Sequence, residues 1–266
     1  MKLTTSLFLI CYAAIGSIAL AQVPPSPSEP VTPSASVALS PAIIMVRAKP
    51  GQSTTQTLTI VNHTANMVNF AVDTEDVVIL DGKRSYSAAG RIANGIAATS
   101  VVSPVSVVVN SGGEASVQVT FTLPPETAQR AVATFFRGIV VAKGGVHLTA
   151  SLGTLITFDV SGDYNLNAGP VQTSSQTPAA NMIFSEELRN IGSEPVMPKG
   201  VIAVLNAAGK RVARAPFISQ RLLPGEHLVF AATNPARLAP GHYHTLASFE
   251  FEGRIVTSAG EFTVPE

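Results

Sequence analysis

Cysteine and tryptophan are nearly missing from this chain of 266 residues, which has one cysteine, Cys11, and no tryptophan. No disulfide can form within the chain, so its stability has to come from buried apolar surface. Charge is scarce as well, because only 13% of the residues are charged and the formal net charge is zero. This balance argues against a nucleic-acid-binding protein, which would carry a basic patch, and the 46% hydrophobic content argues against a disordered chain.

Long apolar runs are also missing, except near the N-terminus, where residues 7–20 contain no charged residue. Lys2 precedes this run, and Ala19-Leu20-Ala21 supplies the small-x-small pattern of a cleavage site before Gln22. The run is short for a bilayer-spanning helix, which needs about 20 apolar residues. We therefore expect residues 1–21 to be a cleaved export signal rather than a retained anchor. The mature protein should then be periplasmic or extracellular, without a membrane span.

Proline and serine dominate residues 22–36, a composition that cannot pack a core and is typical of an extended linker. From residue 37 onward, short runs rich in β-branched residues alternate with Gly, Asn, Asp and Pro turns, without helical periodicity. This spacing predicts an all-β chain built as tandem sandwiches. A turn and a Pro/Ser/Thr-rich stretch after it place the boundary between domains of residues 37–162 and 163–266. Residues 128–134 are the one place where a short helix could begin.

The most regular run covers residues 146–160, where apolar side chains recur at every second position. Alternation of this kind buries one face of a strand and leaves the other in water. If this strand lies at a sheet edge, its free backbone groups can pair with a strand of a partner protein. On that hypothesis Leu148, Ala150 and Leu152 form the docking row; the alternative is that these three side chains fill the core.

Two further patterns concern the second half of the chain. Residues 57–62 are weakly similar to residues 184–190, and both segments end in asparagine. Tyr243 follows the turn Leu238-Ala239-Pro240-Gly241, as in the tyrosine corner of immunoglobulin-type sandwiches, where the hydroxyl bonds to backbone a few residues upstream. The alternative explanation is an ordinary buried tyrosine. Under either explanation Tyr243 contributes to the fold and not to a binding or catalytic site.

The first domain contains a series of motifs in a fixed order: Lys49-Pro50-Gly51-Gln52, a Thr-rich strand ending at Asn62, Ser103-Pro104, Gly112-Gly113-Glu114, and Phe135-Phe136-x-Gly138 before the long strand. These motifs resemble the N-terminal domain of periplasmic pilus chaperones of the PapD-like superfamily. Asn190-x-Gly192 and Leu223-Pro224-Gly225 look like the immunoglobulin-like domain that follows it in related envelope proteins. The resemblance implies two tandem immunoglobulin-like β-sandwiches. Such folds serve many functions, so the motifs specify the fold better than the activity.

One feature of that family is not matched here. In pilus chaperones an Arg in the first strand and a Lys in the last strand of the N-terminal domain hold the terminal carboxylate of the subunit. Ile43 and Ile44 stand near the expected position of the Arg, and Gly153 and Thr154 near that of the Lys. The carboxylate anchor is therefore not carried over to this chain.

The sequence offers no convincing catalytic, cofactor or metal site. The nucleophile-elbow and zinc-protease motifs are absent from it. His242 and His244 would face the same side of a strand, but a zinc site needs three or four converging ligands. Asp73, Glu75 and Asp76 form an acidic cluster that we interpret as a solvated loop. Asn62-His63-Thr64 fits a glycosylation sequon, although a turn at a strand end explains the asparagine equally well.

The sequence thus predicts an exported, non-enzymatic protein that binds another envelope or surface protein by strand pairing, as a chaperone-like or assembly factor. The alternative is a surface or wall-associated adhesion or structural module. An adjacent outer-membrane usher gene would favour the first function, and a chain found on intact cells bound to polysaccharide would favour the second.

Export with cleavage after Ala21 has a direct test. The intact mass of the exported protein, measured by mass spectrometry, should correspond to a chain that begins at Gln22. A mass that retains residues 1–21 would contradict a cleaved signal.

Overall fold

The computed structural model of this chain describes residues 36–141, 147–174, 181–234 and 237–265, which belong to one compact unit, Ala35–Glu266. The export signal predicted at residues 1–21 and almost all of the linker predicted at residues 22–36 lie outside the described residues. The described parts contain eighteen strands and one short 3-10 helix, η1 (Ala97–Thr99), and are all-β as expected. Among them, no helix has the length and apolarity needed to span a membrane.

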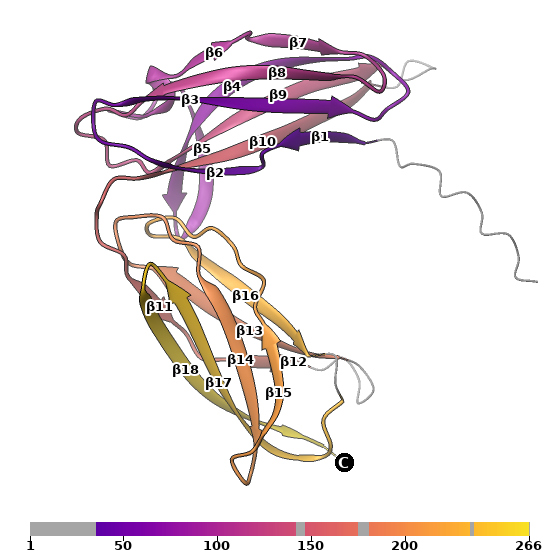
Figure 1. Cartoon of the computed structure of the whole chain (residues 1–266), viewed down its shortest axis with the longest axis vertical. Helices are drawn as coiled ribbons and strands as arrows, with labels where there is room; N and C mark the ends of the chain where they lie inside the picture. The colour runs from indigo at the N-terminus through magenta and orange to yellow at the C-terminus, as the bar shows by residue number, and fades with distance from the viewer. Residues whose placement is uncertain (1–35, 142–146, 175–180, 235–236, 266) are drawn as a thin grey trace, which may run out of the picture. The chain divides into compact units, whose positions relative to one another are not determined.

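The first β-sandwich comprises the first ten strands (Figure 1). They are β1 (Val37–Ser40), β2 (Ile43–Arg47), β3 (Ser53–Asn62), β4 (Val68–Leu80), β5 (Lys83–Ala88), β6 (Val101–Ser103), β7 (Ser106–Val109), β8 (Glu114–Thr122), β9 (Ala131–Val141) and β10 (His147–Asp159). One sheet has the order β1-β3-β8-β6. The other has the order β2-β10-β9-β4-β5, with β7 paired to β4.

The chain changes sheets between its first two strands. β1 pairs antiparallel with β3, from Val37 opposite Asn62 to Ser40 opposite Thr59. After Pro41 the chain crosses to the other sheet, where β2 pairs parallel with the C-terminal part of β10, from Ile43 opposite Leu155 to Arg47 opposite Asp159. The first segment of the sandwich thus closes part of both sheets.

The core of this sandwich is formed by the inward face of each sheet. Leu58 and Ile60 on β3 alternate with outward threonines, and Thr55 and Thr59 bond to hydroxyls of β8 across the outer face. The largest buried rings pack edge to face, in the pairs Phe70–Phe136 and Phe121–Phe158. The alternation in the sequence therefore does predict which face of each strand is buried.

The second β-sandwich comprises the remaining eight strands. They are β11 (Leu166–Ala168), β12 (Gln172–Ser174), β13 (Met182–Asn190), β14 (Lys199–Asn206), β15 (Arg211–Pro216), β16 (His227–Asn234), β17 (Gly241–Phe251) and β18 (Arg254–Val264). One sheet joins β11, β12 and β16 to β13, and the other has the order β15-β14-β17-β18. The tyrosine corner is confirmed, because the Tyr243 hydroxyl donates to the Ala239 carbonyl at 2.7 Å.

The weak similarity between residues 57–62 and 184–190 corresponds to a shared feature of the two sandwiches. In each, a strand ends in a fully buried asparagine. The Asn62 side-chain amide donates to the carbonyls of Asn66, Val109 and Asn110, and its oxygen accepts from Thr64. The Asn190 amide donates to the carbonyls of Glu194 and Leu222. Each amide thus links the end of its strand to backbone carbonyls of neighbouring segments, and some of these carbonyls also accept a second hydrogen bond.

Two local features differ from what the sequence indicated. No helix begins within residues 128–134, the place where the sequence left room for one, because Ala131 onward pairs with β4 and β10 as part of β9. The acidic cluster is not a loop, since Asp73, Glu75 and Asp76 lie within β4. Strand alternation sends Asp76 to the buried face, where it accepts the Ala97 N–H at 2.9 Å, whereas Asp73 and Glu75 pair with Arg137 on the outer face.

Glu186 is a charged residue inside the second sandwich. It lies on the inward face of β13 with 1% of its surface exposed, and neither carboxylate oxygen has a hydrogen-bond partner among the residues that the structure describes. Burial raises the pKa of Glu186, an effect that the nearby Ser258 hydroxyl offsets only in part. The fold therefore favours the protonated carboxyl.

Replacing Glu186 with Gln should make stability less dependent on pH. Because the folded pKa of Glu186 is raised, its contribution is complete below the ordinary pKa of glutamate and is lost as pH rises through the raised value. Glu186→Gln should unfold at higher urea concentration than the wild type at pH 8, with a gap that shrinks towards pH 4. Glu187→Gln, at the exposed neighbouring position, is the control; equal effects of both variants at both pH values would contradict the prediction.

Candidate functional site

The candidate site is the edge of the first sandwich along the N-terminal part of β10. On one side β10 is paired with β9 over almost its whole length, from His147 opposite Val141 to Thr157 opposite Ala131. On the other side β2 pairs only with Leu155–Asp159. Within the described residues no strand pairs with the second edge of residues 147–153, so this part of β10 has one neighbour where the rest has two.

Hydrogen bonds at the closed end of β10 show which backbone groups face the open edge. The Leu155 N–H donates to the Ala42 carbonyl at 3.0 Å, on the β2 side, whereas the Phe158 N–H donates to the Arg130 carbonyl at 2.8 Å, on the β9 side. Backbone groups of successive strand residues point to opposite edges. By this alternation the N–H and C=O groups of Thr149, Ser151 and Gly153 point to the open edge.

The three residues predicted to form a docking row lie at alternate positions of this same segment. Leu148 stands opposite Val140, Ala150 opposite Gly138 and Leu152 opposite Phe136. The structure describes the backbone of Leu148 and Ala150 but not their side chains. Leu152 is half-buried and packs against the first core. The docking row thus stays a prediction.

An aromatic and cationic cluster, which was not predicted from the sequence, lies on the outer face of the same sheet, with residues from β9 and β5. The Phe135 ring packs edge to face with Tyr86 at 5.1 Å, and the Arg137 guanidinium lies 4.5 Å from the Phe135 ring centre. Gly153 stands opposite Phe135, and a Cβ at position 153 would come within 2.9 Å of that ring. The glycine thus leaves room for an aromatic ring against the backbone of β10.

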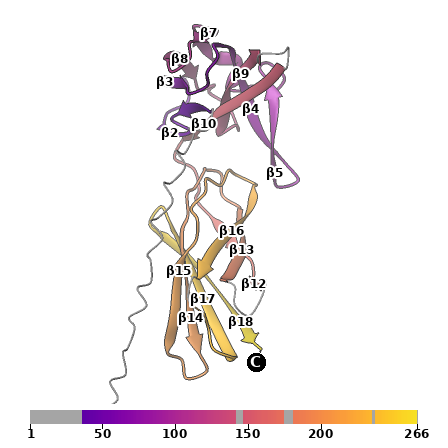
Figure 2. The same cartoon turned by 90° about the vertical axis from the view of Figure 1, so that its right-hand side faces the viewer.

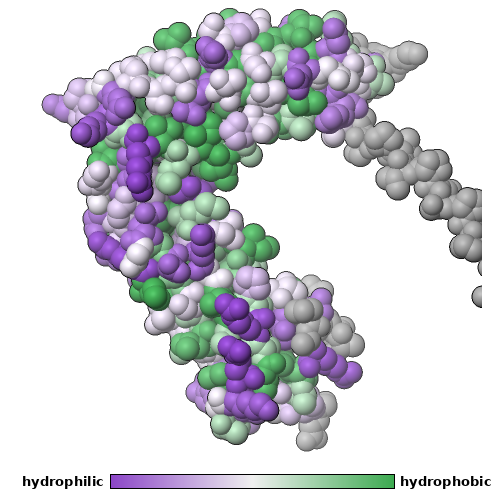
Figure 3. Space-filling model, in the orientation of Figure 1, coloured by the Kyte–Doolittle hydropathy of each residue, from purple (hydrophilic) through white to green (hydrophobic). Residues whose placement is uncertain are grey.

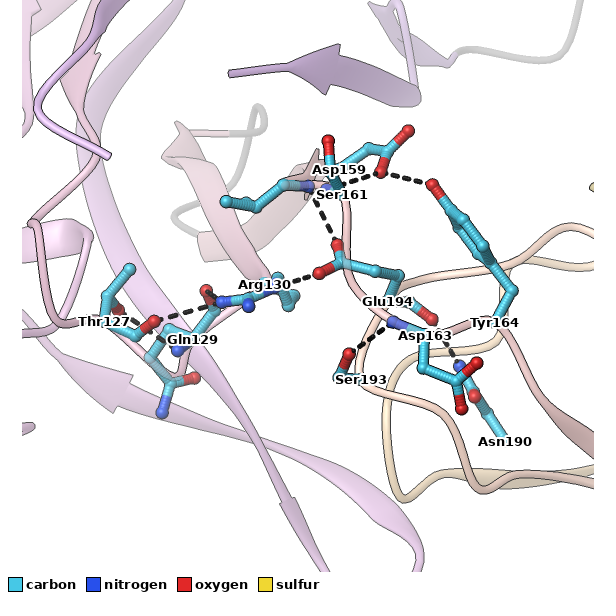
Figure 4. Close-up of polar contacts among 11 residues, drawn as sticks. Thr127, Gln129, Arg130, Asp159, Ser161, Asp163, Tyr164, Asn190, Ser193 and Glu194 are labelled. Atoms are coloured by element: carbon cyan, nitrogen blue, oxygen red, sulfur yellow. Dashed lines mark hydrogen bonds and ion pairs between the residues drawn. The ribbon is translucent and has the colours of Figure 1, made fainter. Parts of the chain in front are cut away.

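The closed end of β10 is held by a buried carboxylate from the second sandwich (Figure 4). Glu194 is fully buried; its two oxygens accept from Arg130 Nε at 3.0 Å and from the Val160 N–H at 2.9 Å. Next to it, Asp159 accepts from the Tyr164 hydroxyl at 2.5 Å, and this hydrogen bond raises the pKa of Tyr164 to about 12. One end of the strand is therefore fixed by ionic contacts, and the other end has an open side.

A second set of contacts joins the β4–β5 hairpin, seen in Figure 2, to the loop before β16. The His227 N–H donates to the Gly82 carbonyl at 3.0 Å, and Arg84 Nε lies 2.6 Å from a carboxylate oxygen of the buried Glu226. A small apolar cluster of Val77, Ala131, Ala133 and Leu223 packs beside these contacts.

The histidines considered as metal ligands contact other groups. His242 Nδ1 lies 2.9 Å from the Thr263 hydroxyl, and His244 Nδ1 lies 3.2 Å from a Glu261 oxygen. In the part of the chain that the structure describes, no group of three or more His, Cys, Asp or Glu side chains is arranged to hold a metal ion. The backbone edge is therefore the feature with the clearest binding chemistry.

No protein-family model matches this chain, and no curated protein matches it. Solved structures of pilus and fimbrial chaperones do match it, as the sequence motifs led us to expect. The class 5 fimbriae chaperone CfaA is 13% identical, with a TM-score of 0.43 over 87% of this chain and 100% of that chain. The CsuC–CsuE chaperone–tip adhesion subunit complex of Acinetobacter baumannii Csu pili is 11% identical, with a TM-score of 0.42 over 85% of this chain and 98% of that chain. The CupB2 chaperone of Pseudomonas aeruginosa is 11% identical, with a TM-score of 0.38 over 85% of this chain and 100% of that chain.

Glu194 should be essential for stability because it is a buried acid with two partners. Glu194→Gln removes its charge and leaves Arg130, which is 16% exposed, without an ion pair. Breaking a buried ion pair on one side costs about 3–5 kcal/mol. Urea denaturation should show a loss of that order, whereas Asp163→Asn, which breaks the exposed pair with Arg254, should change stability by less than about 1 kcal/mol. Similar losses in both variants would contradict the assigned role of Glu194.

Proposed function

We propose that this protein is an exported, non-enzymatic chaperone-like or assembly factor that binds another envelope protein by strand pairing. The observation that carries the proposal is the open edge of residues 147–153 in β10. An extended segment of a partner can add to such an edge through main-chain hydrogen bonds, while alternate side chains give specificity.

The sequence of this edge supports a binding role. Free strand edges in soluble proteins are normally blunted by lysine, proline, bulges or a covering loop, because they promote aggregation. Residues 147–153 read His-Leu-Thr-Ala-Ser-Leu-Gly, without proline, Lys, Arg, Asp or Glu. An edge of this length without protection is expected where a partner strand occupies it.

Surface chemistry also favours backbone pairing over a broad apolar contact. On the face of the molecule drawn in Figure 3, hydrophobic and hydrophilic residues are interspersed. We propose that the main chain of Thr149, Ser151 and Gly153 supplies the hydrogen bonds, and that Leu148, Ala150 and Leu152 contact alternate side chains of the partner. The Phe135–Tyr86–Arg137 cluster lies on the opposite, outer face of the same sheet, where Phe135 packs over Gly153.

The organisation that accompanies this proposal is the one expected from the sequence. Residues 1–21 would direct export, residues 22–36 would link the signal to the folded part, and residues 37–162 and 163–266 would be the two domains. The partner-binding edge then belongs to the first domain, and the ionic contacts of Glu194 connect its closed end to the second.

Exchanging one residue on the open edge tests the proposal. Ser151→Pro removes an N–H that points to the open side, where proline is tolerated, whereas Ser151→Ala keeps this N–H and is the matched control. Tagged proteins with either substitution would be exported in the native host, and the envelope proteins that co-purify would be quantified by mass spectrometry. Recovery of the partner should fall at least about tenfold with Ser151→Pro and stay unchanged with Ser151→Ala. The proline removes one hydrogen bond to the partner strand, and its ring also clashes with that strand.

Hydrogen exchange gives the second measurement. In the free wild-type protein the amides of Ser151 and Gly153 should exchange quickly, while that of Leu152, which faces β9, is protected. Strong protection of all three amides in the isolated protein would mean that the edge is already occupied and would overturn the proposal. Equal partner recovery with both Ser151 variants would do the same, and a chain found on intact cells bound to polysaccharide would favour adhesion instead.

A further inference from the structure

A cavity of about 380 Å³ lies between β2, the β4–β5 hairpin and the loop that precedes β16. It is not part of the β10 edge. Two exposed or half-buried cations of the hairpin, Lys83 and Arg84, contribute to its wall, together with Arg221 from the loop. The other lining residues are Ile43, Ser219, Gln220, Glu226 and Leu228.

Arg221 is the unusual member of this wall. Only 6% of its surface is exposed, and its Nε has no hydrogen-bond partner in the described part of the chain. Its Nη1 contacts the sulfur of Met45 at 3.4 Å, which is a weak acceptor. Within the described residues Arg221 forms no ion pair, although a buried guanidinium is normally held by a carboxylate or by several carbonyls.

The acids around Arg221 are occupied or distant. Glu226 is paired with Arg84 and also accepts the Leu223 N–H at 2.8 Å. Asp159 accepts from Arg47 and Tyr164. Glu252, which is exposed, favours the charged form of Arg221 only from a distance, and burial lowers the pKa of the Arg221 guanidinium. Three cations thus meet one acid in the cavity wall, and that acid already has its partner.

We propose that this cavity binds an oxyanion, a carboxylate or a phosphate, with the Arg221 guanidinium as its main ligand and Lys83 at its rim. Arginine binds both groups through paired N–H donors, and Arg221 is part of the cavity wall. A bound oxyanion would satisfy a buried charge that is otherwise costly. The anion is either free in solution or carried by an acidic group of the bound protein; the second source rests on the proposed function, whereas the site itself does not.

Thermal unfolding of the full exported chain tests the site, with inorganic phosphate and acetate as probes and sodium chloride of equal ionic strength as the reference. At a probe concentration tenfold above Kd, the Tm of the wild type should rise by about 3 °C relative to sodium chloride. Arg221→Met should abolish the shift and be at least as stable as the wild type without anions, because an apolar side chain replaces an unpaired buried charge. Lys83→Ala, at an exposed position, should keep the fold and weaken the shift. Arg211→Met, an exposed arginine of β15, should leave the shift unchanged.

Each outcome decides the proposal. A wild-type Tm that is equal in phosphate, acetate and sodium chloride would overturn it, as would the same shift in Arg221→Met. The source follows from the co-purification assay used for β10. Loss of partner recovery in Arg221→Met, with Arg211→Met as the control, would mean that the partner carries the anion, whereas normal recovery together with the Tm shift would mean a free anion. Failure of strand pairing with Ser151→Pro leaves the Tm result unaffected, so the two proposals can fail separately.

Discussion

The first two strands of this protein, β1 and β2, form hydrogen bonds in different sheets, and the rest of the structure depends on that division. β1 completes the edge of one sheet, and β2 then covers only the C-terminal part of β10 in the other. A strand that continued without a break beside β10 would close its whole edge, and one that stayed beside β3 would leave it entirely open. The crossover at residues 41–42 therefore sets the length of free backbone to about seven residues.

The two halves of β10 have different roles. The C-terminal half stabilises the sandwich, and the N-terminal half has backbone groups that are free to pair with another strand. The closed half of β10 has backbone neighbours on both sides, apolar packing through Ile156 and Phe158, and the buried carboxylate of Glu194 at its end. Within the described residues, β9 is the one strand that forms a ladder with the open half. Main-chain groups left free on a well-anchored strand lose little conformational entropy when a partner pairs with them, because their geometry is already fixed. Anchoring one half thus prepares the other half for association.

Much of the fold follows from local pattern, because alternation and turn residues act over a few positions. The alternation of residues 146–160, the tyrosine after Pro240-Gly241 and the paired asparagines 62 and 190 each identify a feature that the structure contains. The open edge did not follow, since it depends on how far β2 extends beside β10, a contact between positions more than 110 residues apart. Arg221 was missed for a similar reason: a single arginine before Leu222-Leu223 gives no local signal that it will be buried without an acid.

The buried asparagine that closes β3 has a consequence for modification of the protein. Residues 62–64 fit the acceptor motif of N-linked glycosylation, but the Asn62 nitrogen that would receive the sugar donates to three backbone carbonyls and is inaccessible. An oligosaccharyltransferase could reach this nitrogen only before the strand and its turn have formed. A glycan attached at that moment would occupy the buried position of the Asn62 side chain and prevent the first sandwich from folding. Expression in a host that glycosylates this motif would therefore lower the yield of folded protein.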